Sequence, residues 1–299
     1  MTQTMAVADQ DLFESTTPER FLLLRELFRR PAGLVGLLVV TALVVLAIAA
    51  PVVAPYSYAQ QDIPHRMEGP SRAHLLGTDH LGRDLLSRLI YGTRVALGTA
   101  FPAVLSAVCM GILIGLVAGY LGGWVDNAVL VVVDTIQAFP AIILALALLA
   151  VLGPSLRNVV VVIIIAFTPG YARIARAQVL SLKVNPHIEV ERALGARTPR
   201  ILAVHILPNI LPQMFILLAM DMAFGITIEA GLSFLGLGVQ PPNPSWGIVL
   251  ADGFTKIRNS PWPVLWASLA IMIATLGFTV FGETLRDILD PKLAGTRLR

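Results

Sequence analysis

The sequence predicts an all-α polytopic membrane protein with six transmembrane helices. Of its 299 residues, 56% are hydrophobic and 14% are charged, whereas about a quarter of the residues of a soluble domain are charged. Six mostly uncharged runs approach or exceed the ~20 residues that a membrane-spanning helix needs. The net charge of +3 comes from arginines beside these runs. We therefore expect a lipid bilayer around the chain and no nucleic-acid partner.

The N-terminal segment, residues 1–30, is expected to remain in the cytoplasm. It contains five acidic residues and lacks the basic-then-apolar arrangement of a cleavable signal peptide. Its second half, residues 19–30, places apolar side chains among charges, which favours an amphipathic helix on the membrane surface. The first membrane run, residues 31–54, follows three arginines that should hold its start on the cytoplasmic side.

A polar stretch, residues 55–92, separates the first run from the rest and is expected on the external side. Four leucines near its end have the spacing of a half-buried helix, in which Asp84 and Arg88 can pair because they lie four residues apart. A metal site built from His74, Asp79 and His80 was weighed. Their spacing matches no ligand motif, so no metal site is predicted.

The remaining membrane core, residues 93–285, holds five further runs. In the run from 95 to 120, Gly111, Gly115 and Gly119 recur every four residues, so one face of the helix should allow another backbone to approach closely. The only cysteine, Cys109, lies within this apolar run and is expected to pack there.

Asp134 lies early in the next run, residues 125–151. A lone carboxylate in hydrocarbon is costly and is a functional candidate by default. Its early position favours a simpler interpretation, in which it pairs with an arginine of the next loop. The fourth run starts near residue 158 and ends before Arg173 and Arg176, which must either snorkel or lie at the cytoplasmic surface.

The fifth run starts near Val204, and two prolines make its first turns irregular. Asp221 and Glu229 fall near its middle and end, as possible pathway or structural polar residues. The Gly- and Pro-rich residues 230–246 predict a turn or a re-entrant loop buried in protein. The sixth run, residues 264–281, precedes a cytoplasmic tail, residues 286–299.

Between the fourth and fifth runs lies a charged stretch, residues 185–212. Asn185 and Pro186 predict a helix start, Gly195 predicts its end, and Thr198-Pro199 predicts a second start. Two short helices joined by a sharp bend should result. Helical spacing places the apolar residues of the first helix on one face and its charges on the exposed face. From this pattern alone, the favoured interpretation is an ordinary loop helix lying on its own membrane surface.

This stretch resembles the "EAA" loop of the membrane subunits of ATP-binding cassette (ABC) importers. The resemblance is carried by Glu189, by Arg192-Ala193-Leu194-Gly195 and by His205-Ile-Leu-Pro. Val190 and Glu191 replace the two alanines that the family usually has, and His205 is typical of the dipeptide/oligopeptide/nickel branch. Three further stretches resemble the same branch, in its second-permease form: residues 77–94, 232–247 and 285–291.

The resemblance implies a type I ABC importer permease fold with a cytoplasmic coupling helix within about 185–205. In that family the coupling helix docks on the ATP-hydrolysing subunit. The residues implied in ATPase coupling here are Glu189, Glu191, Arg192, Ala193, Leu194 and Gly195.

The partners implied are a second and different permease chain, two ABC ATPase subunits and an external substrate-binding protein. ATP and Mg²⁺ would be bound by the ATPase subunits and no cofactor by this chain. Its three lysines do not follow glycine, so no phosphate-binding loop is present and no catalytic residue is predicted.

The expected function is therefore import of di- or oligopeptides, with nickel, glutathione or another small solute as the alternative. An ion-coupled secondary carrier, with Asp134, Asp221 and Glu229 as a relay, is a rival of a different class. Such a carrier would need an inverted repeat, which the sequence does not reveal. A structural scaffold would leave the loop motifs without a role.

Overall fold

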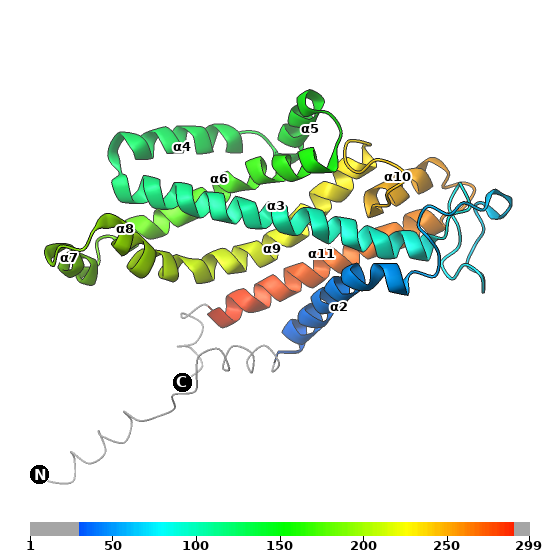
Figure 1. Cartoon of the computed structure of the whole chain (residues 1–299), viewed down its shortest axis with the longest axis horizontal. Helices are drawn as coiled ribbons and strands as arrows, with labels where there is room; N and C mark the ends of the chain where they lie inside the picture. Colours follow the sequence, from blue (N-terminus) through cyan, green and yellow to red (C-terminus); the bar gives the residue numbers. More distant parts are fainter. Residues whose placement is uncertain (1–29, 290–299) are drawn as a thin grey trace, which may run out of the picture.

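The computed structural model describes residues 30–289 and forms an all-helical bundle in that part of the chain (Figure 1). The expected amphipathic helix of residues 19–30 and the tail after residue 289 lie outside the described residues. The helices are α2 (Pro31–Val53), α3 (Leu85–Leu121), α4 (Gly123–Gln137), α5 (Ala141–Leu152), α6 (Leu156–Leu182), α7 (Pro186–Ala193), α8 (Thr198–Arg200), α9 (Leu207–Phe234), α10 (Trp246–Thr255) and α11 (Trp262–Leu289), with short 3₁₀ and π turns, η2 (Ile63–His65) and η3 (Ile201–Ile206).

Among residues 30–289, five helical stretches are long and apolar enough to cross a membrane: α2, α3, α6, the continuous stretch from α8 to α9, and α11. The expected third run differs from the prediction of a single helix. It is broken at Pro140 into α4 and α5, which meet at 90°. Pro140 has no N–H to donate and disfavours helical geometry at the residue before it, so the helix ends there. Counting this bent pair as one span gives the predicted six.

The centre of the bundle is the contact between α3 and α6. A Cβ atom added to Gly115 would lie 2.5 Å from Cβ of Ala175, and one added to Gly119 would lie 2.8 Å from Cβ of Val179. Gly111 faces Tyr171 in the same way. The three glycines therefore form the predicted face for close backbone approach. Gly98 does not belong to it, since no atom lies within 4 Å of the position a Cβ would take.

A second layer is formed by α2 and α11, which lie side by side along the bundle (Figure 1). Gly36 of α2 meets the backbone of Phe281, and Gly277 of α11 meets Val39. At the end of the pair, Nη1 of Arg30 donates to Asp287 at 2.8 Å. The start of α2 and the end of α11 therefore lie at the same end of the bundle.

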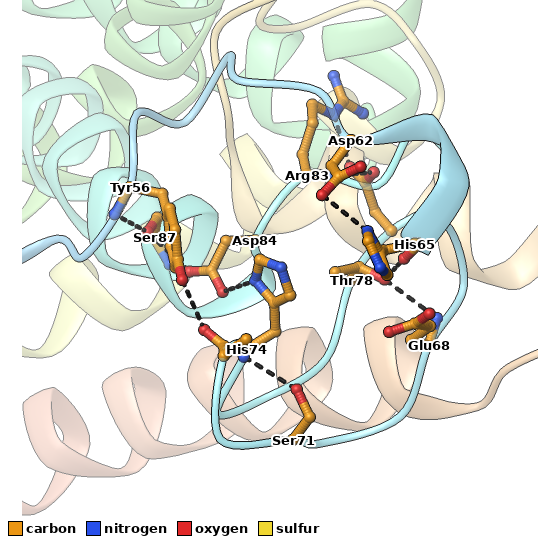
Figure 2. A network of polar contacts seen from close by, with 12 residues as sticks. Tyr56, Asp62, His65, Glu68, Ser71, His74, Thr78, Arg83, Asp84 and Ser87 are labelled. Atoms are coloured by element: carbon orange, nitrogen blue, oxygen red, sulfur yellow. Dashed lines mark hydrogen bonds and ion pairs between the residues drawn. The ribbon is translucent and has the colours of Figure 1, made fainter.

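Residues 54–84 fold back onto the start of α3 at the opposite end (Figure 1). Figure 2 shows their polar network, in which Asp84 accepts from the backbone N–H and the hydroxyl of Ser87, both at 2.7 Å, and contacts Nδ1 of His74 at 3.0 Å. Asp84 is thus the N-cap of α3. The predicted pair with Arg88 is wrong, because the capping geometry turns the carboxylate towards Ser87.

Arg88 turns instead to Asp79, with Nε and Oδ2 3.4 Å apart. The same carboxylate accepts from Nε of Arg83 at 2.6 Å. Both arginines are almost fully buried. Elsewhere in the segment Asp62 contacts His65 at 2.8 Å and raises the pKa of that imidazole. This pairing stabilises the segment below the ordinary histidine pKa and is lost as the pH rises through the higher, folded-state pKa.

The Gly- and Pro-rich stretch after α9 is a loop that ends in α10, a short helix that the sequence did not predict. The buried Trp246 begins α10, and its indole N–H donates to the carbonyl of Leu89 at 2.9 Å. A Cβ on Gly92 would lie 2.7 Å from the same ring. The end of the loop is therefore fixed against α3. The prediction of a buried loop over residues 230–246 holds only in part, because residues 230–234 belong to α9 and residues 235–236 and 240–243 are exposed.

The glycine contact gives a matched pair of variants. We expect Gly115→Ala to lower the free energy of unfolding by about 1–3 kcal/mol, because the added methyl overlaps Ala175. Gly98→Ala meets no atom and gains helix propensity, so it should be neutral or slightly stabilising. Unfolding of the full chain in detergent measures both. Equal effects of the two substitutions would contradict this description of the α3–α6 contact.

Candidate functional site

The charged stretch between α6 and α9 projects from one end of the bundle (Figure 1). We call residues 185–200 the elbow; they comprise α7, the turn at Gly195 and α8. Helix α7 starts as predicted, with Asn185 in the N-cap position and Pro186 at its first residue. The Asn185 side chain makes no capping hydrogen bond. The second helix starts one residue earlier than predicted, with Arg197 as N-cap.

The turn at Gly195 closes α7. Gly195 has φ +86°, its N–H donates to Arg192 O at 3.0 Å, and the N–H of Ala196 donates to Glu191 O at 3.0 Å. This is the Schellman arrangement, which requires a residue in the left-handed region. The bend predicted at Gly195 is therefore present, and its backbone hydrogen bonds make it a defined turn.

Three contacts attach the elbow to the bundle. Ile188 is fully buried in the hydrophobic core. The guanidinium of Arg192 lies 5.8 Å from the ring centre of Tyr120, near the end of α3. Oε1 of Glu191 lies 3.6 Å from Nε2 of His205 in η3. The elbow is therefore held by one apolar anchor and two polar contacts, one to α3 and one to η3.

The prediction that α7 covers its apolar face is wrong, whereas its charged residues Glu189 and Arg192 are exposed as expected. Leu194 is 79% exposed and Val190 is 57% exposed, and Ala193 is also exposed. Ile188 is the residue that turns inward, and at 100° per residue Val190 and Leu194 lie about 160° and 120° away from it. Anchoring Ile188 thus rotates the other apolar side chains outward.

These outward side chains form a compact surface with charges around it. We call it the outer face of the elbow, and it consists of Glu189, Val190, Ala193, Leu194 and Arg197, all exposed. Apolar side chains gathered on a projecting surface and rimmed by polar groups are typical of a protein interaction site. The arrangement suits docking and contains no group positioned for bond-making chemistry.

The end of the bundle beneath the elbow is fixed by ion pairs and a cap. Arg173 pairs with Asp134, which confirms the pairing expected for this carboxylate, although Arg173 lies within α6 and not in a loop. Arg176 binds both oxygens of Asp126. The ammonium group of Lys183 donates to the carbonyl of Gly119 at 2.8 Å. The contacts of Arg176 and Lys183 join the end of α3, the start of α4 and the end of α6, whereas the Arg173–Asp134 pair lies farther along α4 and α6.

Sequence reasoning missed the pair between Arg176 and Asp126. The available signal was an acidic residue in a short turn without Lys or Arg, opposite two arginines at the end of the fourth run. The contact of Lys183 was not predicted either. Its contact with one of the last carbonyls of α3 complements the helix dipole.

Asp221 and Glu229 lie elsewhere, along α9. Asp221 is half-buried near the hydroxyl of Tyr171. Glu229 is fully buried under the loop that precedes α10, and the hydroxyl of Ser233 donates to its Oε1 at 2.7 Å. Its Oε2 has no hydrogen-bond partner among residues 30–289. The structure does not bring either residue together with Asp134 or the elbow.

The structure also separates the residues that were considered as metal ligands. His74 contacts Asp84, whereas Asp79 and His80 lie with Asp252, with one ligand atom of each within 4.8 Å of the others. Both oxygens of Asp79 already accept hydrogen bonds, including those from Arg83. This carboxylate is therefore neutralised by an arginine and poorly suited to binding a further cation.

Comparisons with known proteins identify relatives of the whole chain. Residues 111–295 match the family described as "Binding-protein-dependent transport system inner membrane component", and residues 22–70 match the "N-terminal TM domain of oligopeptide transport permease C". Among solved structures, the chain is similar to one of the MetNI methionine ABC transporter in inward-facing conformations. The TM-score is 0.53 at 18% identity, with 68% of this chain and 96% of that chain covered.

Three curated relatives are similar over most of their length. The dipeptide transport system permease protein DppC of Alkalihalophilus pseudofirmus is 39% identical, over 95% of this chain and 93% of its own. The glutathione transport system permease protein GsiD of Pectobacterium atrosepticum is 40% identical, over 90% of each chain. The nickel transport system permease protein NikC of Escherichia coli K12 is 36% identical, over 86% and 93%.

The turn at Gly195 can be tested without steric ambiguity, since no atom lies within 4 Å of an added Cβ. We expect Gly195→Val to destabilise the turn by about 1–3 kcal/mol through its left-handed φ alone, and amide exchange of Ala196 should accelerate about 5- to 100-fold. Gly195→Asn is the control, because asparagine tolerates this region. Hydrogen exchange measures both, and equal rates for the two variants would contradict the assignment.

Proposed function

The chain belongs to the family of binding-protein-dependent transport system inner membrane components, and we propose that the outer face of its elbow binds an ATP-hydrolysing subunit. Within that family it is an ABC importer permease of the peptide, glutathione and nickel group. It is a multi-pass inner membrane protein and not itself an enzyme, since the ATPase of such importers is a separate subunit. Membership of this family excludes the two alternative functions, an ion-coupled carrier and a structural scaffold.

The observation that carries the proposal is the exposure of Val190 and Leu194. Both are apolar, both lie on a projection, and charged residues surround them. In the lipid-facing helices exposed apolar side chains need no protein partner. On the elbow they stand among Glu189, Arg192 and Arg197, so a complementary protein surface accounts for them better than hydrocarbon does.

The covalent connections of the elbow support a mechanical role. It continues directly from α6 and leads through η3 into α9. Because the Gly195 turn is closed by backbone hydrogen bonds, a displacement of α7 would be transmitted to both helices. We propose that closure of two ATPase subunits on ATP draws the elbows of two permeases together, and that the bundles then exchange inward- and outward-open arrangements.

The proposed assembly contains a second, different permease, two ATPase subunits and an external binding protein. ATP and Mg²⁺ would reside on the ATPase subunits. We place both termini and the elbow in the cytoplasm. The ion pair between Arg30 and Asp287 supports this, because it joins the start of α2 to the end of α11 at the end of the bundle that carries the elbow (Figure 1).

We propose di- or oligopeptides as the substrate. The relatives named for dipeptide and glutathione transport are 39% and 40% identical, and the nickel permease is 36% identical. Two of these three relatives thus carry peptide-like compounds. Nickel or another small solute is the alternative, and a binding assay on the external binding protein of the assembly would distinguish them.

Docking through the outer face predicts the effect of Leu194→Ser. The association of the permease with its ATPase subunit should weaken by about 1.5–3 kcal/mol, the contribution of one buried leucine. The melting temperature of the isolated permease should not change, since Leu194 is 79% exposed. Affinity capture of the ATPase and its substrate-stimulated hydrolysis measure the loss.

The matched control is Leu75→Ser, at the opposite end of the bundle and 61% exposed. It should leave capture of the ATPase unchanged. If Leu194→Ser also left capture and stimulated hydrolysis at wild-type values, the proposed docking surface would be wrong.

A further inference from the structure

A groove between α2, α3, α9 and α11 is not used by the proposed coupling mechanism. Its volume is about 610 Å³, within the range of cavities that hold small molecules. The lining is apolar except for one cation, Arg94. The walls are formed by Val44 and Ile48 of α2, Gly98 and Phe101 of α3, Met222 of α9 and Phe278 of α11.

Arg94 is the only polar feature of this groove. Its side chain is exposed and pairs with no acidic side chain among residues 30–289. Gly98 and Phe101 follow four and seven residues later, on the same helical face. The cation therefore lies at one end of an apolar channel, with the open space beside Gly98 directly below it.

The depth of Arg94 matches the boundary between hydrocarbon and headgroups. No charged residue occurs between Arg94 and Asp126, a stretch long enough to cross the bilayer core. One turn above Arg94, the ring of Tyr91 contacts that of Tyr58, with centroids 4.8 Å apart. Tyrosines are enriched at this interface. A phosphate at headgroup depth would thus lie within reach of the guanidinium.

We propose that the groove binds an anionic phospholipid, with its phosphate on Arg94 and an acyl chain along Gly98 and Phe101. An acyl chain forms no hydrogen bonds, and the lining of the groove contains almost no hydrogen-bonding groups. A peptide would leave backbone N–H and C=O groups unsatisfied in this groove. The charge of Arg94 selects an anionic headgroup over a zwitterionic one.

The outer side of the groove is apolar. Along α2 the lining extends from Val40 to Ile48, about 12 Å at 1.5 Å per residue. Ile48 is 75% exposed. An acyl chain suits this lining, and a helix of the second permease is the rival occupant that a crosslinking experiment distinguishes.

Native mass spectrometry of the delipidated full chain tests whether Arg94 selects an anionic headgroup. Phosphatidylglycerol and phosphatidylcholine with identical acyl chains would be titrated separately. We expect wild type to bind phosphatidylglycerol about 5-fold more tightly, Arg94→Gln to lose this preference and Arg94→Lys to retain it. Arg157→Gln, at an exposed arginine outside the groove, should behave as wild type. A preference that survives in Arg94→Gln would overturn the proposal.

A photoactivatable acyl chain tests the groove itself. Phosphatidylglycerol with a diazirine in the chain should label Phe101 and Met222 in wild type. Gly98→Leu should reduce that label at least 5-fold, because its side chain fills space that is free of protein atoms. Val44→Trp fills the same space from α2, and it replaces Gly98→Leu in the experiment if that variant does not fold. Label that persists in the filled variants would contradict the assignment.

Experiments on the assembled transporter distinguish the lipid from the other possible occupants of the groove. A cysteine introduced at Ile48, in a chain lacking Cys109, should form no crosslink to the second permease. Added transported peptide should leave the lipid label unchanged. A crosslink would make the groove a subunit interface, and displacement by peptide would make it part of the transport pathway. Either result would overturn the lipid assignment.

Discussion

The contact between α3 and α6 is the constraint on which the rest of the structure depends. Three glycines on α3 allow the backbone of α6 to approach so closely that a single methyl group would overlap it. Close approach of this kind replaces the hydrophobic driving force that helices in lipid lack. It also fixes the position of α6 along α3, and hence the position of the elbow that follows α6.

The ends of α3 and α6 show how this alignment is used. With the two helices in register, Lys183 reaches the carbonyl of Gly119, Arg192 reaches the ring of Tyr120, and Arg176 reaches Asp126. Each of these three cations therefore faces a helix C-terminus, an aromatic ring or a carboxylate. Arg197 remains exposed on the outer face, where a partner can contact it.

Much of the fold could be predicted from the sequence because apolar runs, glycine spacing and proline breaks act locally. The Gly111, Gly115 and Gly119 face, the turn at Gly195 and the irregular start of α9 all follow from such patterns. The orientation of α7 could not, since two apolar faces compete and burial of Ile188 decides between them. The partner of Arg88 likewise depends on how residues 54–84 fold back over α3.

The site was predicted mainly by resemblance, and the structure adds a physical reason for it. Helical periodicity alone favoured a helix lying on its own membrane surface for residues 185–200. Exposure of Leu194 and Val190 away from the bundle argues against that reading. The carboxylates considered for a carrier are dispersed, with Asp134 of α4 paired to Arg173 of α6 and Glu229 buried under the loop that precedes α10.

Accessibility of a single cysteine at position 194 tests the account most directly. In a chain without Cys109, Leu194→Cys would be treated with a membrane-impermeant maleimide in inside-out and right-side-out vesicles, with and without the ATPase subunits. The account predicts labelling only from the cytoplasmic side, and at least ~10-fold slower labelling in the assembled transporter. Labelling from the external side, or equal rates with and without the ATPase subunits, would contradict it.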